Sequence, residues 1–162
     1  MPHITVQHSG MNLDLDLIQN AIQSLEGNNW WFLDPTTLAE MPFTPGEFCL
    51  IAPRGDNKNC LEPKELNQRK RIVLSPINRE RLSQQWRFVD VASYHPNERG
   101  ENIPNNCTGW YYIINHMGRV GTRPHWSMGV SGESLAAKAR VVLWQVANPN
   151  VQCPGNHWWR PV

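Results

Sequence analysis

The chain has 162 residues, with 15 Lys or Arg against 14 Asp or Glu, so its formal net charge is +1. This length predicts one domain with its own hydrophobic core, over residues 1–162. The balanced charge disfavours nucleic-acid binding, because proteins that follow a phosphate backbone normally have a one-sided basic surface. The one basic cluster, Arg69-Lys70-Arg71, adjoins an apolar run and is interpreted as a solvated strand entry.

No uninterrupted apolar stretch reaches membrane-spanning length, and the start Met1-Pro2-His3 lacks the charged-then-apolar pattern of a secretory signal. We therefore expect a soluble protein, cytoplasmic or secreted by an unconventional route, without membrane insertion. The 13 prolines and 11 glycines are spread along the chain, which favours many short elements over long helices.

The first predicted unit covers about residues 3–35. Apolar and polar side chains alternate in it, as in strands with one buried face, and turn residues separate the alternating runs. The predicted strands are residues 4–7, 13–15, 21–25 and 30–33. A helix over 15–25 is the competing prediction, because apolar residues there also recur at helical spacing.

Two further units follow. The second covers about residues 46–91, and its predicted strands are 48–51, 60–62, 71–74 and 85–89. A polar stretch at 93–106 predicts a long surface loop. The third unit covers about residues 109–147, with strands at 110–115 and 141–146 around a middle broken by Pro and Gly. A tail, residues 148–162, follows, and the sequence leaves open whether it closes the fold or lies exposed.

Each unit contains an apolar run around a tryptophan, and similar stretches lead up to it. Self-similarity at a period of roughly 40–55 residues indicates one structural unit used three times, which decides for strands over the helix at 15–25. Four strands per unit predict an all-β barrel of the β-trefoil type with pseudo-threefold symmetry, in which six strands close the barrel and six form hairpins that cap it. The tryptophans predicted in the core are Trp31, Trp86 and Trp144.

These residues resemble the ricin-B-like β-trefoil lectins, especially the small fungal ones. Residues 4–15 are similar to the family's first two strands, in which an apolar strand and a Ser-Gly turn precede Leu-Asp-Leu. Gln84-Gln85-Trp86 matches the QxW signature, and residues 44–48 are similar to the family's Pro-Gly-x-aromatic opening. The signature position reads Asn29-Trp30-Trp31 in the first unit and Val142-Leu143-Trp144 in the third, so one copy is intact.

The resemblance implies a carbohydrate-binding lectin for galactose or N-acetylgalactosamine-type glycans, with no catalysis. In this family an Asp, an aromatic residue and an Asn together bind one sugar. Asp14 and Asn28 match the Asp and Asn positions of the first unit, and Gln23 could reach the same pocket. The aromatic position falls on Leu25, a departure that weakens stacking against the sugar ring. Structural roles are the alternatives: Asp14 as a solvated strand residue, and Asn28 as a turn former.

The other two units match the family's pattern less well. Glu62 takes the acidic position of the second unit and Ser83 the amide position, which implies a weaker or altered site. In the third unit Val120-Gly121 replaces the acidic residue, although His125 and Trp126 are aromatic. We therefore expect the first unit to bind best, then the second, then the third.

The expected partners are glycans or glycoproteins. A shallow polar pocket binds one sugar with a Kd on the order of millimolar to micromolar, so avidity needs several sites or a homodimer. No metal or cofactor is expected, because the histidines lack ligand spacing and no catalytic motif occurs. The alternatives are a trefoil protease inhibitor acting through the loop at 54–58 or 93–106, and a trefoil with decayed pockets that only contacts proteins.

Two further patterns stay open at this point. Cys49 could pair with Cys60, and Cys107 with Cys153, while four free thiols are the alternative that the lack of a signal peptide favours. Arg54-Gly55-Asp56 is an integrin-type tripeptide in a predicted loop, but Gly-Asp is also ordinary turn chemistry.

Overall fold

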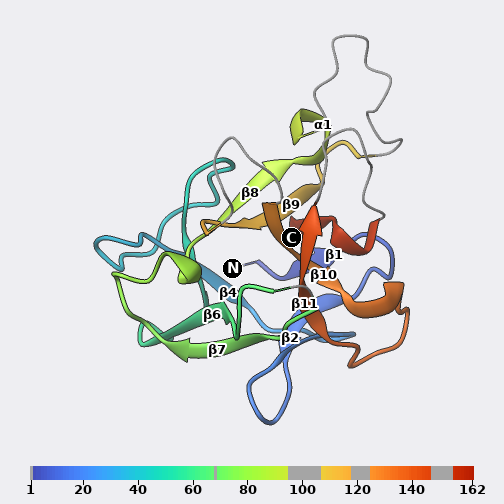
Figure 1. The fold of residues 1–162 in the computed structure, drawn as a ribbon, viewed down its shortest axis with the longest axis horizontal. Coiled ribbons are helices and arrows are strands. Elements are labelled where there is room, and N and C mark those ends of the chain that lie inside the picture. The colour runs from blue at the N-terminus through green and yellow to red at the C-terminus, as the bar shows by residue number, and fades with distance from the viewer. Residues whose placement is uncertain (1, 68, 95–106, 118–124, 147–154) are drawn as a thin grey trace.

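The computed structural model describes residues 2–67, 69–94, 107–117, 125–146 and 155–162, and these are almost entirely β structure (Figure 1). The strands are β1 (Ile4–Val6), β2 (Asn12–Leu15), β3 (Ala21–Ser24), β4 (Trp30–Leu33), β5 (Leu50–Pro53), β6 (Asn59–Pro63), β7 (Ile72–Pro76), β8 (Trp86–Asp90), β9 (Tyr111–Asn115), β10 (His125–Val130), β11 (Val141–Val146) and β12 (Trp159–Pro161). Short helical turns are α1 (Val91–Tyr94) and the 3₁₀ turns Leu82–Gln84, Ser131–Glu133 and Gly155–His157. None of the helices in the described ranges is long and apolar enough to span a membrane.

Six strands form a ring. β1 pairs with β12, β12 with β9, β9 with β8, and β4 with β5, all antiparallel. Cys49 and Trp86 exchange main-chain hydrogen bonds of 2.8 and 2.9 Å, which joins the start of β8 to the chain just before β5. The Trp30 N–H donates to the Pro2 carbonyl at 3.0 Å and links β4 to the chain before β1. The main hydrophobic cluster draws buried side chains from all six of these strands.

The other six strands pair as the hairpins β2–β3, β6–β7 and β10–β11. Single bridges connect each hairpin with the other two, and they join Asn20 to Val73, Ile22 to Arg140, and Arg71 to Val142. A triangle of hairpins therefore covers one end of the ring, as a pseudo-threefold arrangement requires.

A turn with the same backbone geometry precedes the third strand of each unit. Gln19, Arg69 and Lys138 have positive φ angles of 66°, 62° and 67°. Each bonds through its main chain to the third strand of another unit, and the pairs are Gln19 with Leu74 at 2.9 Å, Arg69 with Leu143 at 2.8 Å, and Lys138 with Gln23 at 2.8 Å. The strained turns thus lie at the three junctions between units.

Three tryptophans occupy equivalent positions inside the ring, and Trp30, Trp86 and Trp159 are all 0% exposed. Each indole N–H donates to a main-chain carbonyl on the second strand of its own unit. The acceptors are Leu13 at 3.1 Å, Leu61 at 2.9 Å and Met128 at 3.0 Å. A buried N–H needs such a partner, so these bonds fix where each ring strand sits against its hairpin.

The prediction that Trp31 and Trp144 are core residues was wrong, because both are only half-buried. Successive side chains of a strand point to opposite faces, so Trp31 faces away from the core that Trp30 enters. Trp144 lies on β11, the third strand of its unit. The fourth strand is β12, which pairs with β1 and β9. The third unit therefore extends into the predicted tail at 148–162 and does not end at residue 147.

The all-β prediction is confirmed, and the helix that competed for residues 15–25 does not form there, since β3 and the turn before it occupy this stretch. The predicted strand bounds match to within two residues, and the two-residue differences are at β5 and at the end of β7. In the broken middle of the third unit, for which no strand bounds were predicted, the structure has β10. The predicted loop at 93–106 lies outside the described residues beyond position 94.

Cys49, Cys60 and Cys107 are buried free thiols, so the Cys49–Cys60 bridge does not form. Burial alone raises the pKa of Cys49 to about 12. Burial, with the nearby carboxylates of Glu62 and Asp56, raises the pKa of Cys60 to about 12. Cys153 lies outside the described residues.

Trp30→Phe should lower the free energy of unfolding by about 1–3 kcal/mol, because the Leu13 carbonyl then loses its buried donor. Trp31→Phe on the same strand is the matched control and should cost less than about 1 kcal/mol. Urea denaturation of both variants measures the difference. Equal losses would show that the indole bond does not matter.

His157 is buried beside Gly129, where a Cβ would overlap its ring. Burial and the proximity of His8 lower its pKa from 6.5 to about 4. As the pH falls, the unfolded chain therefore takes up this proton before the folded protein does. The resulting stability is complete above about 6.5 and is lost as the pH falls toward about 4.

This shift corresponds to about 3 kcal/mol of unfolding free energy across the window. We expect urea midpoints measured between these pH values to decline steeply in the wild type and less steeply in His157→Gln. A variant with the wild-type slope would contradict the assignment of this pH dependence to His157.

Candidate functional site

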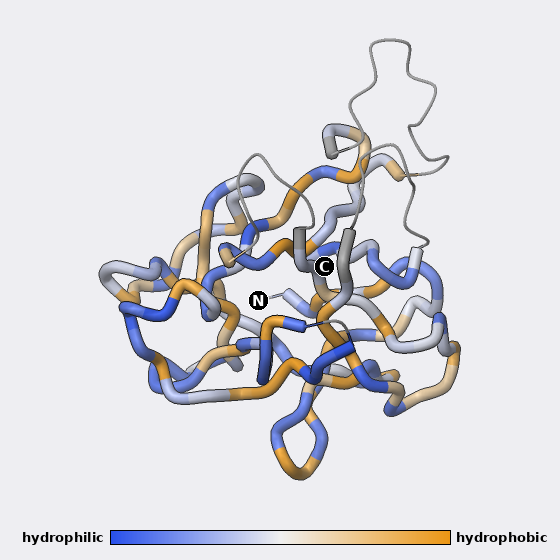
Figure 2. Tube along the Cα trace, viewed as in Figure 1, coloured by the Kyte–Doolittle hydropathy of each residue, from blue (hydrophilic) through white to orange (hydrophobic). Residues whose placement is uncertain are grey.

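A cavity of about 840 Å³ lies where the β2–β3 hairpin of the first unit meets the residues before β11 of the third. We call it the Asp14 cavity. Its polar lining comprises Asp14, Asp16, Ser24, Glu26, Lys138 and Arg140, and its apolar lining Leu15, Leu17, Ile18, Ile22, Leu25 and Ala137. The loop between β2 and β3 projects from the body of the molecule and has an apolar tip (Figures 1 and 2).

Asp14 is held in place by two short hydrogen bonds. Its Oδ1 accepts the Leu15 N–H at 2.8 Å, and its Oδ2 accepts the Ser24 hydroxyl at 2.7 Å. A carboxylate offers about four lone-pair sites, so one site on each oxygen remains for a ligand. Asp14 can therefore accept two hydroxyl protons without giving up the bonds that orient it.

Asp16 also lines the cavity, and its hydrogen bonds shape the projecting loop. Its Oδ1 accepts the N–H groups of Ile18 and Asn20, both at 2.9 Å, and its Oδ2 accepts the Asn20 side-chain amide at 3.2 Å. Burial opposes ionisation of Asp16, but these hydrogen bonds and the nearby Arg140 outweigh it and lower its pKa. The ionised Asp16 thus stabilises the turn that presents Leu17 and Ile18.

Three large aliphatic side chains stand exposed around the cavity. Leu17 is fully exposed, and Ile18 and Leu25 are 74% and 76% exposed. Single exposed apolar side chains are common on proteins, but three on the wall of one cavity form a patch suited to an apolar ligand face. Leu25 has the position where the lectin pattern has an aromatic residue, and Leu17 and Ile18 were not predicted as site residues.

Gln23 and Asn28, the other residues predicted for the first unit, do not line the Asp14 cavity. Gln23 faces Leu13 in the register of the hairpin, one position away from the Asp14–Ile22 pair, so its side chain points to the opposite face. It is 0% exposed and donates to the carbonyls of Ser134 and Ala136 at 3.1 and 2.6 Å.

Asn28 is half-buried and has a turn role. Its N–H donates to the Leu13 carbonyl at 3.1 Å, and its carbonyl lies 3.0 Å from Nδ1 of His3.

The residues predicted for the second and third units also lie away from the Asp14 cavity. Glu62 is 4% exposed, and its Oε2 contacts Nη2 of Arg81 at 2.9 Å and the Ser83 hydroxyl at 3.3 Å. The Glu62 carboxylate is therefore paired with Arg81 within the protein. Trp126 is half-buried and packs against the main core cluster. Val120-Gly121 lies outside the described residues.

The Arg54-Gly55-Asp56 tripeptide forms a turn after β5. The Asp56 carboxylate accepts the N–H groups of Lys58 and Asn59 at 2.7 and 3.0 Å and the Asn59 amide at 3.1 Å. Both of its oxygens are used within the turn, which supports the turn interpretation. The same bonds tie down the loop at 54–58, one of the two candidate inhibitor loops.

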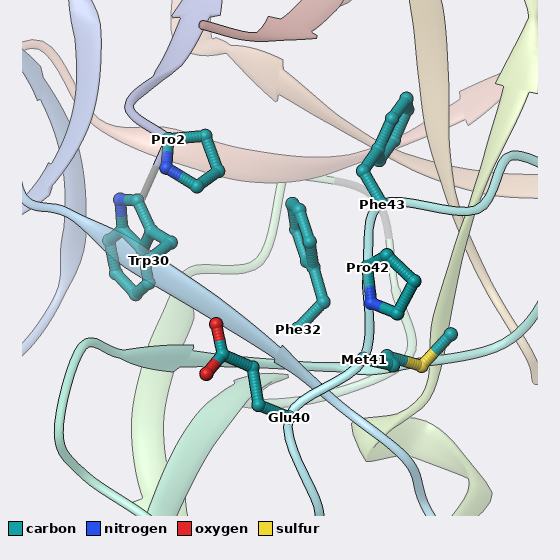
Figure 3. Close-up of a pocket in the computed structure, with 7 residues that line it drawn as sticks. All are labelled: Pro2, Trp30, Phe32, Glu40, Met41, Pro42 and Phe43. Carbon is teal, nitrogen blue, oxygen red and sulfur yellow. The ribbon is translucent and has the colours of Figure 1, made fainter.

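A second cavity, of about 330 Å³, lies near the chain start and has mainly apolar walls (Figure 3). Aromatic and proline rings surround it, and Glu40 is its one charged residue. A ligand with many hydroxyls needs more hydrogen-bonding groups than this cavity offers. In the described part of the chain, no group of three or more His, Cys, Asp or Glu could hold a metal ion.

No protein-family model matches the chain, and a search of curated proteins gives no match. Among solved structures, the designed 3-fold symmetric protein ThreeFoil is similar, with 17% identity, a TM-score of 0.68, and coverage of 99% of this chain and 96% of its own. A Macrolepiota procera ricin B-like lectin, solved in complex with lactose, is similar at 15% identity and a TM-score of 0.59, with coverage of 99% and 92%. The chain has a β-trefoil fold.

We expect Gln23 to stabilise the fold rather than to bind a ligand. Gln23→Ala removes the donor to two main-chain carbonyls of the third unit and should lower the free energy of unfolding by about 1–3 kcal/mol. Asn57→Ala, in an exposed loop, is the control and should stay within about 0.5 kcal/mol. A Gln23→Ala protein as stable as the control would contradict the structural role.

Proposed function

We propose that this trefoil is a lectin that reversibly binds galactose or N-acetylgalactosamine-type glycans in the Asp14 cavity, without catalysis. The observation on which the proposal depends is the Asp14 carboxylate, which is oriented by two hydrogen bonds and still has a free lone pair on each oxygen. It lies in the same cavity as an exposed aliphatic wall. A pyranose has the complementary pair of features, hydroxyls on its edge and C–H bonds on its face.

Each part of the cavity has a role in this proposal. Asp14 accepts the protons of two adjacent hydroxyls, an interaction that is stronger with an ionised acceptor than with a neutral one. Lys138 and Arg140, which come from the third unit, can donate to other sugar oxygens. Leu25 and the pair Leu17-Ile18 cover the C–H face, with less energy than an aromatic ring provides. We expect weak binding, with a Kd on the order of millimolar to micromolar.

The comparison supports the class of ligand to be tested first. The Macrolepiota procera lectin was solved in complex with lactose, a galactoside, and it has the same fold at 15% identity. The second and third units contribute less, because Glu62 is paired with Arg81 and Trp126 packs against the core. We therefore propose one principal site per chain. Avidity through dimerisation stays a prediction.

Asp14→Asn should weaken lactose binding at least about tenfold, because the neutral amide accepts hydroxyl protons less strongly and has one acceptor oxygen instead of two. Isothermal titration calorimetry with lactose measures the change. Glu47→Gln, an exposed carboxylate outside the cavity, is the matched control and should bind as the wild type does. Unchanged affinity in Asp14→Asn would show that the site lies elsewhere, and no binding of galactosides by the wild type would overturn the proposed function.

A further inference from the structure

A third cavity, of about 410 Å³, lies between the second and third units and has a strongly basic wall. Its charged residues are Lys64, Glu65, Arg69, Lys70, Arg71 and Arg140. We call it the basic cavity. Five cations and one carboxylate thus surround one hollow in a chain whose formal net charge is only +1.

The fold assembles this cluster from three places in the sequence. The Lys64 N–H donates to the Arg71 carbonyl at 2.9 Å, which places Lys64 across the hairpin from the Arg69-Lys70-Arg71 run. The Leu143 N–H donates to the Lys70 carbonyl at 2.8 Å and brings in the strand that follows Arg140. The interpretation of Arg69-Lys70-Arg71 as a solvated strand entry is therefore incomplete, because the run lines a cavity together with Lys64 and with Arg140 from the third unit.

Most of this positive charge has no carboxylate to balance it. Lys70 lies 3.3 Å from Glu65, and Arg140 is close enough to Asp16 to help lower the pKa of that carboxyl, but Lys64, Arg69 and Arg71 have no salt bridge to a carboxylate within the described ranges. Like charges gathered around a concave surface repel one another and attract an anion. Arginine and lysine N–H groups are also the usual donors to sulfate, phosphate and carboxylate oxygens.

The trefoil itself does not require cations at this junction. The turn with positive φ that contributes Arg69 and Lys70 here has Gln19 and Asn20 at the equivalent place in the first unit. The third unit has Lys138-Ala139-Arg140 there, so two of its three positions are also cationic. The first unit shows that the same main-chain geometry forms with neutral side chains, and the charge gathered between the second and third units needs another explanation.

Arg140 lines both the basic cavity and the Asp14 cavity, so the two are adjacent. We propose that the preferred ligand is an anionic glycan, with a neutral galactose-type residue in the Asp14 cavity and a sulfate ester or carboxylate in the basic cavity. This inference rests on the proposed function, and it names the class of glycan that the same surface selects. Lys64, Arg71 and Arg140 then donate to the anion, while Asp14 holds the hydroxyls.

The adjoining carboxylates favour a glycan over a nucleic acid. Asp14, Asp16 and Glu26 line the neighbouring cavity and would repel a chain with a charge on every residue. A glycan with one anionic group next to a neutral sugar can place the neutral sugar in the Asp14 cavity and the anionic group in the basic cavity. The two cavities therefore select for the position of the negative charge on the glycan as well as for its presence.

Calorimetry with lactose, a monosulfated lactose and sialyllactose tests the proposal. At low salt the wild type should bind at least one of the anionic sugars about tenfold more tightly than lactose. Lys64→Gln/Arg71→Gln should reduce this preference to less than about twofold and leave lactose affinity unchanged. Lys58→Gln/Arg79→Gln removes the same charges at exposed positions outside the cavity, and this control should keep the preference.

A measurement on the wild type alone covers the case in which the double variant does not fold. Inorganic sulfate should compete with whichever anionic sugar is preferred and leave lactose binding unaffected. Equal affinity of the wild type for all three sugars would overturn this inference while leaving the lectin proposal intact. No binding of any of them would overturn the proposed function itself. A single-stranded oligonucleotide that competes as well as the preferred anionic sugar would show a general polyanion surface and also overturn the inference.

Discussion

The bonds from three buried indole N–H groups to main-chain carbonyls organise this molecule. Trp30, Trp86 and Trp159 each fill the ring and each fix one hairpin relative to it. Because the bonds are equivalent, the three hairpins meet symmetrically and their edges form three junctions. Both polar cavities lie at such junctions, so the geometry of the candidate sites follows from the packing of the core.

The order of strands and the threefold plan could be predicted from the sequence, because alternation and self-similarity are local signals. Which tryptophan enters the core could not. The residues that flank Trp30 and Trp31 do not reveal which of the two indoles points into the core. The pairing of β4 with β5 decides this. In the third unit β12 has just three residues and follows a long connection, so Val141 to Val146 gave the stronger but misleading pattern.

The candidate site was only partly predictable for a similar reason. Asp14 followed from a resemblance to a known strand pattern, but Gln23 was grouped with it although the two residues lie on opposite faces of one hairpin. Leu17 and Ile18 did leave a signal, since two apolar residues inside a turn between Asp16 and Asn20 have no core to enter. The meeting of Arg140 with Lys70 and Arg71 depends on pairing between distant strands, which composition and spacing do not report.

The buried cysteines have a consequence for the conditions that the scaffold tolerates. Cys49 belongs to the ring core and Cys60 to a separate cluster, and both are buried free thiols. With pKa values of about 12, both thiols stay protonated at neutral pH and are poor nucleophiles. Exchange with oxidised glutathione needs a thiolate as the attacking group, so neither thiol reacts readily, and this part of the barrel should withstand a change from reducing to oxidising surroundings.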